Sequence, residues 1–324
     1  MPANLPPQYK KAEESYRQAK TVSEKVAALE EMLALIPKHK GTEHVQGDLK
    51  SRLAKLRAAG EQKKGKSGPD PFHVPKHGAG QIAVVGTPNA GKSALIAAAT
   101  GAPVKVADYP FSTHTPTPAM MPFEDIQIQL LDLPPVTADG MVTGMMGTLR
   151  NADAIVVCLD LAADDLLEQA EICFETMAMR GLVPEGPDVP EGGEAKSMLV
   201  VGTKIDVEGA QENLDVFLEL RPDLSGLLAT SAREKTGLAE FAERCFEMLD
   251  VVRIYSKEPG KDPDFEAPFT LARGSVVLDM ARAVHGEIAQ SLKYARIWGS
   301  GKFDGQPVQQ DHILVDKDII ELHT

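Results

Sequence analysis

Apolar residues near the start of the chain recur with the period of an α-helix. One stripe, with spacings of four and three residues, lies between a capping-box pattern and a proline and comprises Val22, Val26, Leu29, Leu33 and Ile36. A second stripe of the same kind comprises Val45, Leu49, Leu53 and Leu56. We expect the two stripes to pair as an antiparallel helical hairpin within residues 1–66.

The stretch that follows, residues 61–80, has no such period. It contains three prolines and four glycines, which interrupt helices and strands and are typical of turns. We therefore expect a linker over residues 67–80 and a domain boundary at its end.

From Ile82 onward, short β-prone runs alternate with helical segments. The runs are residues 82–85, 126–131, 154–159, 198–201 and 227–229, and the helical segments include 93–100, 165–179 and 238–249. This alternation predicts an α/β domain with a mostly parallel sheet over residues 81–250. Residues 183–196 are rich in Pro, Gly and Glu, and we expect an exposed acidic loop there.

The last part of the chain has a different pattern. Short β-prone runs at residues 251–255, 269–271, 295–298 and 319–322 surround one amphipathic helix over residues 276–288, with Ser275 as its predicted N-cap. One helix packed on a small mixed sheet is an α+β domain, here residues 251–324. The predicted fold class is thus α/β, with a helical hairpin before the parallel-sheet domain and an α+β domain after it.

The charge is unevenly distributed. The chain has 324 residues, which fits two or three domains, and a net charge of −13. Residues 1–66 are nevertheless basic, with 14 Lys and Arg against 8 Asp and Glu. A basic arm on an acidic body suits contact with a polyanion. A solvated hairpin with surplus lysines explains the same charges, so both interpretations stay open.

The cysteines and the apolar runs indicate the compartment. Cys158, Cys173 and Cys245 are scattered within apolar stretches, which favours buried free thiols in a reducing cytoplasm over metal ligation. No uninterrupted apolar run approaches the length of a membrane span, and the N-terminus lacks the apolar segment of a secretion signal. We expect a soluble cytoplasmic protein that contacts no membrane.

Residues 86–93, GTPNAGKS, match the phosphate-loop pattern GxxxxGK[ST] without deviation. The motif follows a β-prone run and opens a helix, where backbone N–H groups and the helix N-terminus can bind phosphates. We expect Lys92 to contact the β- and γ-phosphates and Ser93 to ligate Mg²⁺. The nucleotide-binding residues predicted in this loop are Gly86, Asn89, Ala90, Gly91, Lys92, Ser93 and Ala94.

A second short motif selects the base. Residues 203–206, TKID, follow a β-prone run, and the carboxylate of Asp206 can accept two hydrogen bonds from guanine, whereas adenine has no matching pair of donors. We therefore expect GTP or GDP as the ligand. Lys204 would lie over the base plane, and Thr203 would bond to the phosphate loop. Ser231 and Ala232, after the next strand, would line the base from the other side.

GTPNAGKS, followed by KVADYPFSTHTP, resembles the Obg superfamily of GTPases, whose first switch typically reads ADYPFTT. On that resemblance, Thr113 takes the place of the switch threonine that ligates Mg²⁺ and senses the γ-phosphate. MLALIPKHKGTEHVQGDLKSRLAKLR is similar to the N-terminus of the developmentally regulated GTP-binding (DRG) branch, and the tail, with IYSKEPGKDPDFEAPFTLARGS, YARIWGSGKFDGQPV and DKDIIELH, resembles a β-grasp TGS domain. The resemblance implies a GTPase that acts as a ribosome- or RNA-associated switch.

DRG proteins usually carry a small domain inserted after the second switch. Here only about 63 residues separate Asp132 from Ala195, which is enough for the switch, a strand and one helix. We expect that insertion to be absent.

The second switch, residues 132–147, departs from the DxxG pattern of GTPases. Asp132 should hold Mg²⁺ through water, but the last position is Pro135, which has no N–H to donate to the γ-phosphate. The next residue, where some GTPases place a water-orienting glutamine, is Val136. We expect slow hydrolysis and a second switch that responds weakly to the nucleotide. The alternative is a GTP- or GDP-binding adaptor with negligible turnover.

Asn89 has two interpretations of equal weight. In its PNAGKS context it resembles the asparagine that helps to bind K⁺ beside the phosphates in several cation-dependent GTPases. It is equally a turn former that tolerates left-handed backbone. The predicted catalytic residues are thus Lys92, Thr113 and Asn89, and the predicted cofactors are Mg²⁺ and, on the first interpretation, K⁺.

Two further hypotheses are weaker. A P-loop kinase or ATPase is disfavoured by the TKID motif. An RNA-facing patch in the last domain would consist of Lys257, Lys261, Lys302, Tyr255, Phe303 and Trp298. Aromatic residues in so small a domain more often build its core, and we favour the core for Trp298.

Overall fold

The computed structural model describes residues 70–101, 115–187 and 189–324, together with Tyr16, Lys25, Ala28, Leu29, Met32, Leu33, Leu35 and Leu49. The chain divides into a unit of residues 1–70 and a unit of residues 71–324. In the first unit, Leu29 and Leu49, one from each predicted stripe, are helical and buried. Most other residues of the predicted hairpin, and Thr113 of the first switch, lie outside the described residues.

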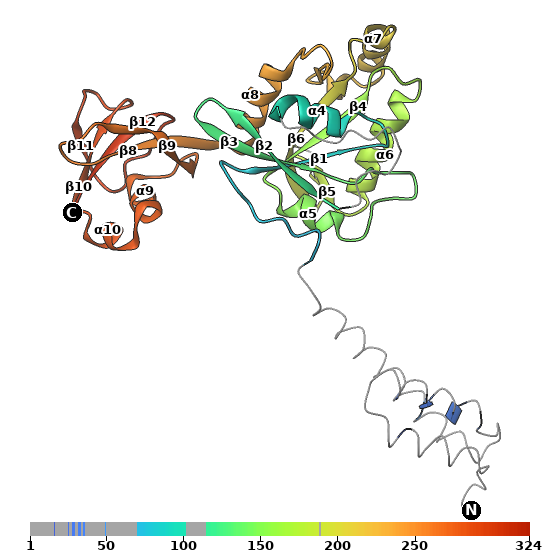
Figure 1. Ribbon diagram of the computed structural model, residues 1–324, viewed down its shortest axis with the longest axis horizontal. Helices are drawn as coiled ribbons and strands as arrows, with labels where there is room; N and C mark the ends of the chain where they lie inside the picture. Colours follow the sequence, from blue (N-terminus) through green and yellow to red (C-terminus); the bar gives the residue numbers. More distant parts are fainter. Residues whose placement is uncertain are drawn as a thin grey trace, which may run out of the picture. The chain divides into compact units, whose positions relative to one another are not determined.

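A seven-stranded sheet organises the first part of the second unit (Figure 1). Its strands are β1 (Gln81–Gly86), β2 (Thr117–Phe123), β3 (Ile126–Asp132), β4 (Ala154–Asp160), β5 (Leu182–Pro184), β6 (Glu194–Thr203) and β7 (Leu228–Ala229). The order is β2-β3-β1-β4-β6-β5, with β7 paired to β6, and only the β2–β3 pairing is antiparallel. The predicted α/β domain with a mostly parallel sheet is confirmed.

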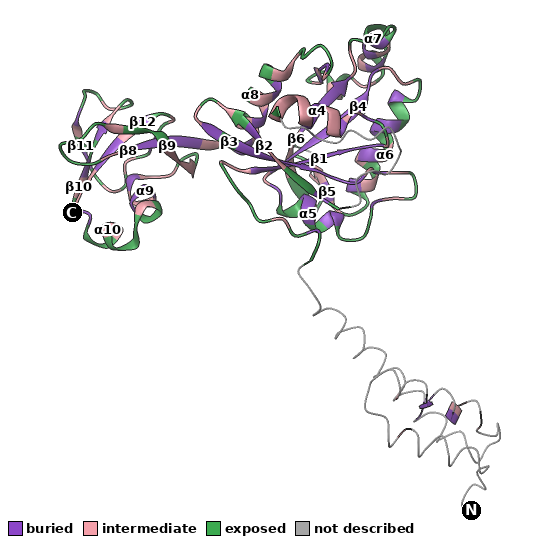
Figure 2. Cartoon of the chain, viewed as in Figure 1, coloured by how far each residue is buried: buried purple, intermediate pink, exposed green. Residues whose placement is uncertain are grey.

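Two apolar layers cover this sheet. One is formed with α4 (Lys92–Thr100) and α8 (Leu238–Leu249). The other is formed with α5 (Met145–Asn151), α6 (Leu166–Ala178) and α7 (Ala210–Leu220), after which comes the 3₁₀ turn η1 (Pro222–Leu224). Because both faces are covered, every residue of β1 and β4 is buried (Figure 2). The three cysteines are buried free thiols, as expected, and burial raises the pKa of Cys158 and Cys173 to about 12.

The parallel strands end at one edge of the sheet, and this edge positions the candidate site. β1, β3, β4 and β6 end at Gly86, Asp132, Asp160 and Thr203. Polar and glycine residues that the sequence places far apart are therefore brought to one side of the domain. Ligands of open α/β sheets bind at this carboxyl edge.

A five-stranded sheet follows α8. It consists of β8 (Val251–Lys257), β9 (Pro263–Ala272), β10 (Tyr294–Trp298), β11 (Gln306–Val308) and β12 (Asp318–His323), in the order β11-β10-β12-β8-β9. The helices α9 (Val277–Val284) and α10 (Gly286–Ser291) lie between β9 and β10 in the chain. A separate apolar core joins α9 to one face of the sheet, which is the predicted α+β arrangement.

The helix expected over residues 276–288 is two helices. His285 is extended, and its ring nitrogen accepts the N–H of Glu287, so α9 ends and α10 begins at this residue. Gly286, a poor helix former, favours the break. The N-cap of α9 is Val276 and not Ser275, because the carboxylate of Asp279 accepts the N–H of Val276 at 3.0 Å.

Two other predictions need correction. The acidic stretch 183–196 is not entirely loop, because β5 and the start of β6 lie in it and pair in parallel, Pro184 opposite Lys196. Trp298 is only partly buried and lies outside the apolar core. It alternates with Ile297 along β10 and so lies on the other face, where the ammonium of Lys257 is 4.9 Å from its ring centre.

Much of the expected linker packs against the sheet domain. The ring of Phe72 is buried, Gly78 forms a β-bridge with Ile128, and the side chain of Gln81 donates to the carbonyl oxygen of Val74. These contacts at the amino edge of the sheet fix residues 71–80 on the domain. The glycine and proline content of the segment did not reveal this packing.

The stretch between β3 and β6 contains α5, β4, α6 and β5. In the part of this stretch that the structure describes there is no additional domain, as expected. Among the described residues no helix is long and apolar enough to cross a membrane.

Candidate functional site

The phosphate loop turns from β1 into α4 through left-handed backbone. Asn89 has φ of 61° and Gly91 has φ of 77°. At Gly86 there is no room for a side chain, because a Cβ atom would lie 2.5 Å from the carbonyl oxygen of Cys158. The left-handed conformation supports the turn-former interpretation of Asn89, and its role towards K⁺ stays a prediction.

Lys92 is folded back onto its own loop. Only 7% of it is exposed, and Nζ donates to the carbonyl oxygens of Gly86 at 3.1 Å and Thr87 at 3.0 Å. Burial lowers the pKa of Lys92, and the neighbouring Cys158 and Asp132 oppose this shift only in part. An ammonium with neutral acceptors can exchange them for phosphate oxygens, which form stronger charge-assisted bonds.

Ser93 and Asp132, two of the predicted magnesium ligands, meet at the carboxyl edge. The hydroxyl of Ser93 donates to Oδ2 of Asp132 at 2.5 Å. Hydroxyl and carboxylate oxygens are ligands that suit Mg²⁺. No group of three or more His, Cys, Asp or Glu side chains within the described ranges could hold a metal ion. Mg²⁺ at this pair would need further oxygen ligands, such as phosphate oxygens, water or the predicted Thr113.

Thr203 connects the end of β6 to the phosphate loop. It is almost fully buried, and its hydroxyl lies 3.0 Å from the carbonyl oxygen of Ala90 and 3.1 Å from that of Leu159. The bond to the phosphate loop expected of Thr203 is present. A Cβ at Gly91 would approach Oγ1 of Thr203 to 2.9 Å, so the close contact also requires glycine there.

The carboxylate of Asp206 is oriented by a neighbouring loop. Ser231 donates its hydroxyl to Oδ1 of Asp206 at 2.6 Å and accepts the N–H of Glu234 at 2.9 Å. The hydroxyl of Ser231 thus acts as both donor and acceptor, and it fixes the rotamer of Asp206. A carboxylate held in this way is arranged to accept donors from a flat base edge.

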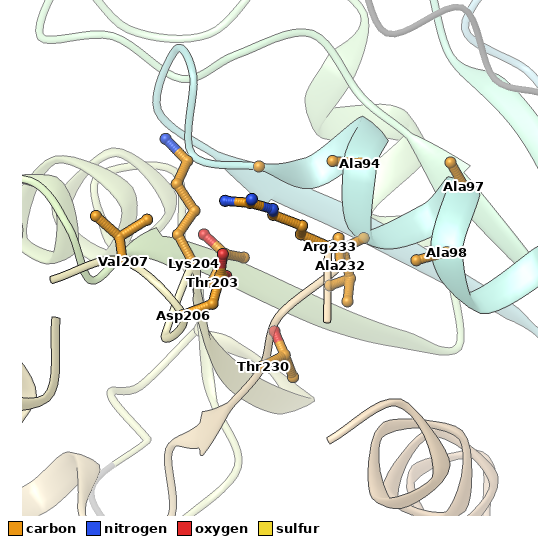
Figure 3. A pocket seen from close by; sticks show the side chains of 12 residues that line it. Ala94, Ala97, Ala98, Thr203, Lys204, Asp206, Val207, Thr230, Ala232 and Arg233 are labelled. Carbon is orange, nitrogen blue, oxygen red and sulfur yellow. The ribbon is translucent and has the colours of Figure 1, made fainter. Parts of the chain in front are cut away.

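A cavity of about 590 Å³ lies beside this carboxylate (Figure 3). It is bounded by α4, by the segment after β6 and by the segment after β7. Its wall is mostly apolar, a property typical of ligand pockets, with a few polar groups at one side. The lining includes Gly91, Ala94, Ala97, Ala98, Thr203, Lys204, Asp206, Val207, Ala232 and Arg233.

Asp160 is a residue of the candidate site that the sequence reasoning missed. Its buried carboxylate lies 2.5 Å from Nζ of Lys204, whose backbone has φ of 62°. The ion pair holds the alkyl stem of Lys204 along the cavity. Asp160 is the last residue of β4 and so lies at the carboxyl edge of the sheet. This position is the feature of the sequence from which it could have been predicted.

The segment after Asp132 is packed tightly beside the phosphate loop. Val136 is fully buried, and its N–H donates to the carbonyl oxygen of Gly86 at 3.0 Å. Farther along, the hydroxyl of Thr148 in α5 donates to the carbonyl oxygen of Phe72 at 2.6 Å. A Cβ at Gly144 would lie 2.8 Å from the ring of Phe72. The second switch is thus held at both of its ends.

Two family models match the chain. The model described as "50S ribosome-binding GTPase" matches residues 81–182, and the TGS domain model matches residues 252–324. The structure of the YchF GTPase of Schizosaccharomyces pombe is similar, with a TM-score of 0.56, 13% identity, and coverage of 78% of this chain and 99% of that chain. At this identity the similarity shows the fold alone.

Curated relatives match the chain over nearly its whole length. GTP-binding protein 1 of Schizosaccharomyces pombe is 30% identical, with 94% of this chain and 99% of the relative covered. Developmentally-regulated GTP-binding protein 1 of Xenopus laevis is 28% identical, with 92% and 98% covered. The first alignment extends over 362 positions, so the relative contains segments that this shorter chain lacks. The chain belongs to the developmentally regulated GTP-binding (DRG) family and is a GTP-binding protein, with a P-loop GTPase domain and a C-terminal TGS domain.

Proposed function

We propose that this protein binds GTP at the carboxyl edge of the seven-stranded sheet and hydrolyses it slowly to GDP and phosphate. The observation that carries the proposal is the convergence of three groups on one edge. These groups are the buried ammonium of Lys92, the Ser93–Asp132 pair and the Asp206 carboxylate held by Ser231. They suit the phosphates, the metal and the guanine of a bound nucleotide, respectively.

Each group has one task. Lys92 neutralises charge on the β- and γ-phosphates, and Ser93 and Asp132 hold Mg²⁺, which when bound offsets charge on the same oxygens. Asp206 accepts the two donors of guanine, and Lys204 covers the base plane. Thr113 is proposed as the further metal ligand on the resemblance alone.

Slow turnover follows from the second switch. Val136 has an apolar, fully buried side chain where a water-orienting group would be useful. Pro135 offers no N–H to the γ-phosphate, and the N–H of Val136 is already bonded to Gly86. These observations also favour the second candidate function, an adaptor that binds GTP or GDP with negligible turnover.

Two measurements test this proposal. Fluorescent-nucleotide titration of wild type and Asp206→Asn should show a large loss of guanine-nucleotide affinity, with Asp215→Asn, on the exposed face of α7, as the control. Single-turnover hydrolysis then separates the two functions, since the adaptor would leave bound GTP intact over hours. Equal affinity of the wild type for ATP and GTP would contradict guanine recognition.

A role of Asn89 in K⁺ binding can be separated from its role in the turn. Asn89→Gly keeps a residue that tolerates φ of 61° but removes the amide oxygen. We propose that K⁺ accelerates hydrolysis relative to Na⁺ in wild type and that Asn89→Gly abolishes this difference. Equal rates in K⁺ and Na⁺ for wild type would contradict the proposal.

We further propose that the partner is a ribosome or another RNA, contacted by the basic arm or by the TGS domain. The uneven charge and the "50S ribosome-binding GTPase" model support this. Replacing Lys63, Lys64 and Lys66 by Gln should weaken co-sedimentation with ribosomes and reduce its salt dependence if the arm makes phosphate contacts. The matched triple, exposed Lys261, Lys293 and Lys302 replaced by Gln, tests the TGS domain. If neither triple changes co-sedimentation, both contact sites are wrong.

A further inference from the structure

The turn between β2 and β3 contacts the TGS domain through a cluster of charged side chains. At its centre is Arg253 of β8, which is only 3% exposed. Within the TGS domain, Asp316 binds this guanidinium in bidentate fashion, with Nε to Oδ1 at 3.0 Å and Nη2 to Oδ2 at 2.6 Å. The remaining nitrogen, Nη1, faces the turn.

Both acidic residues of the turn bind this side of the cluster. Nη1 of Arg253 lies 2.9 Å from Oδ1 of Asp125 and also contacts Glu124. The hydroxyl of Tyr255 donates to the other oxygen of Asp125, and Nζ of Lys317 lies 2.9 Å from Glu124. We call Glu124, Asp125, Arg253, Tyr255, Asp316 and Lys317 the junction cluster.

Aromatic rings complete the surroundings of Arg253. Phe123, the last residue of β2, stacks on Phe246 of α8 with ring centres 4.9 Å apart. The guanidinium carbon lies 4.8 Å from the centre of Phe246 and 5.9 Å from that of Phe123. A buried guanidinium that is bound by a carboxylate through two hydrogen bonds and lies against aromatic rings is held in one orientation. The junction cluster thus fixes the position of the turn on β8.

The same hairpin reaches the candidate site at its other end. β2 and β3 pair along their full length, from Thr117 opposite Asp132 to Phe123 opposite Ile126. β2 begins four residues after Thr113 of the predicted first switch, and β3 ends at Asp132, which is bonded to Ser93. The continuous pairing of β2 with β3 links the end near the nucleotide to the turn, so we expect a shift of β2 at that end to be transmitted to the turn.

The second switch, the other segment beside the phosphate loop, is restricted in its movement. The second switch is held by the N–H of Val136 at the phosphate loop and by Thr148 at Phe72, and Pro135 has no donor for the γ-phosphate. A change that GTP causes in the first switch therefore passes more readily along β2.

We propose that the β2–β3 hairpin couples the nucleotide site to the TGS domain through Arg253, so that the junction cluster differs between the GTP and GDP states. The inference rests on the proposed function, since it requires two nucleotide states. Coupling of this kind is reciprocal, so loosening the junction must also change the preference of the site for GTP over GDP.

The test uses the full chain with Glu124→Gln and Asp125→Asn combined. These changes keep the shapes of both side chains and leave Asp316 on Arg253, so the TGS domain retains its internal partner. Tyr255→Phe is a milder second variant that removes only the hydroxyl donor to Asp125. The control is Arg282→Gln, which removes the exposed ion pair with Asp279 on α9 and leaves the Asp279 cap in place.

Two readouts are measured on each protein, namely the affinities for GDP and a non-hydrolysable GTP analogue, and amide exchange of β8 and β12 in both states. In wild type we expect exchange of β12 to differ between the states. The double variant should lose that difference and change the GTP-to-GDP affinity ratio at least about fivefold. Tyr255→Phe should change both in the same direction by less, and the control should change neither.

The outcomes separate the two proposals. If wild type binds no guanine nucleotide, the proposed function fails and the coupling with it. If wild type binds both nucleotides but β12 exchanges equally in the two states, the coupling alone is wrong. It is also wrong if the double variant, folded by its melting temperature, keeps the wild-type difference in exchange and an affinity ratio within twofold.

Discussion

Restoring an N–H at position 135 is the most direct test of how the second switch works. The neighbouring backbone is fixed, since Leu133 donates to the carbonyl oxygen of Val84 at 3.3 Å and Val136 to that of Gly86 at 3.0 Å. Pro135→Ala and Pro135→Gly therefore add a donor to a segment already held beside the phosphate loop. Pro134→Ala, one residue earlier, is the matched control because it leaves position 135 without a donor.

The expected magnitude follows from one charge-assisted hydrogen bond. A bond to a charged group contributes about 1.5–3 kcal/mol, which corresponds to a roughly 10- to 150-fold gain in affinity for GTP relative to GDP. Removing a proline that fits its backbone costs about 0.4–1 kcal/mol of stability through the unfolded chain, and glycine adds roughly 0.5–1 kcal/mol. Stability should thus fall slightly while GTP preference rises.

The assay is titration of each variant with fluorescent GDP and a non-hydrolysable GTP analogue, beside chemical denaturation. Pro135→Ala and Pro135→Gly should raise the ratio of GTP-analogue affinity to GDP affinity by similar factors, and Pro134→Ala should leave this ratio unchanged. A ratio within threefold of wild type in both variants would refute the reasoning. If only Pro135→Gly raises the ratio, the cause is the greater freedom of the glycine backbone and not the restored N–H donor.

Three further predictions follow from contacts of the same domain. Gly86→Ala forces its Cβ to within 2.5 Å of the carbonyl oxygen of Cys158, so the loop must shift, and we expect at least a tenfold loss of nucleotide affinity by titration. Thr148→Val removes the donor to the carbonyl oxygen of Phe72 and should lower the free energy of unfolding by about 1–3 kcal/mol in denaturant. Burial alone would raise the pKa of Asp125, but hydrogen bonds from its partners in the junction cluster outweigh it and the pKa is lowered. The stability that Asp125 contributes is therefore present above its unfolded pKa of 3.8 and is lost as pH falls through the lower folded value. Denaturation of wild type and Asp125→Asn should differ at pH 7, and the difference should shrink only as pH falls below 3.8.

The parallel-sheet domain could be predicted because its period and its motifs agree. Each motif falls at the end of a β-prone run, so strand order alone brings Lys92, Asp132 and Asp206 to one edge. β2 was missed because Pro118 and Pro122 interrupt its pattern. An edge strand tolerates such residues, since one side of it needs no ladder bonds.

The remaining errors come from contacts that have no local signal. Asp160 and Lys204 are 44 positions apart, and their ion pair follows only from the pairing of β4 with β6. Trp298 was favoured for the core because aromatic residues tend to be buried, but alternation along β10 assigns it to the other face of the sheet. Residues 71–80 have linker composition, yet Gln81 and Phe72 hold them on the domain by tertiary bonds.

The chemistry of the junction cluster determines the conditions under which the proposed coupling operates. Glu124 and Lys317 are about half exposed, so salt screens their attraction at physiological ionic strength. Arg253 is almost fully buried between Asp316 and Asp125, and salt screens buried pairs much less. Adding salt should therefore weaken the outer pair and leave the inner contacts intact. The coupling then depends on Asp125 more than on Glu124, and Asp125→Asn alone should reproduce most of the effect of the double variant at 0.15 M salt.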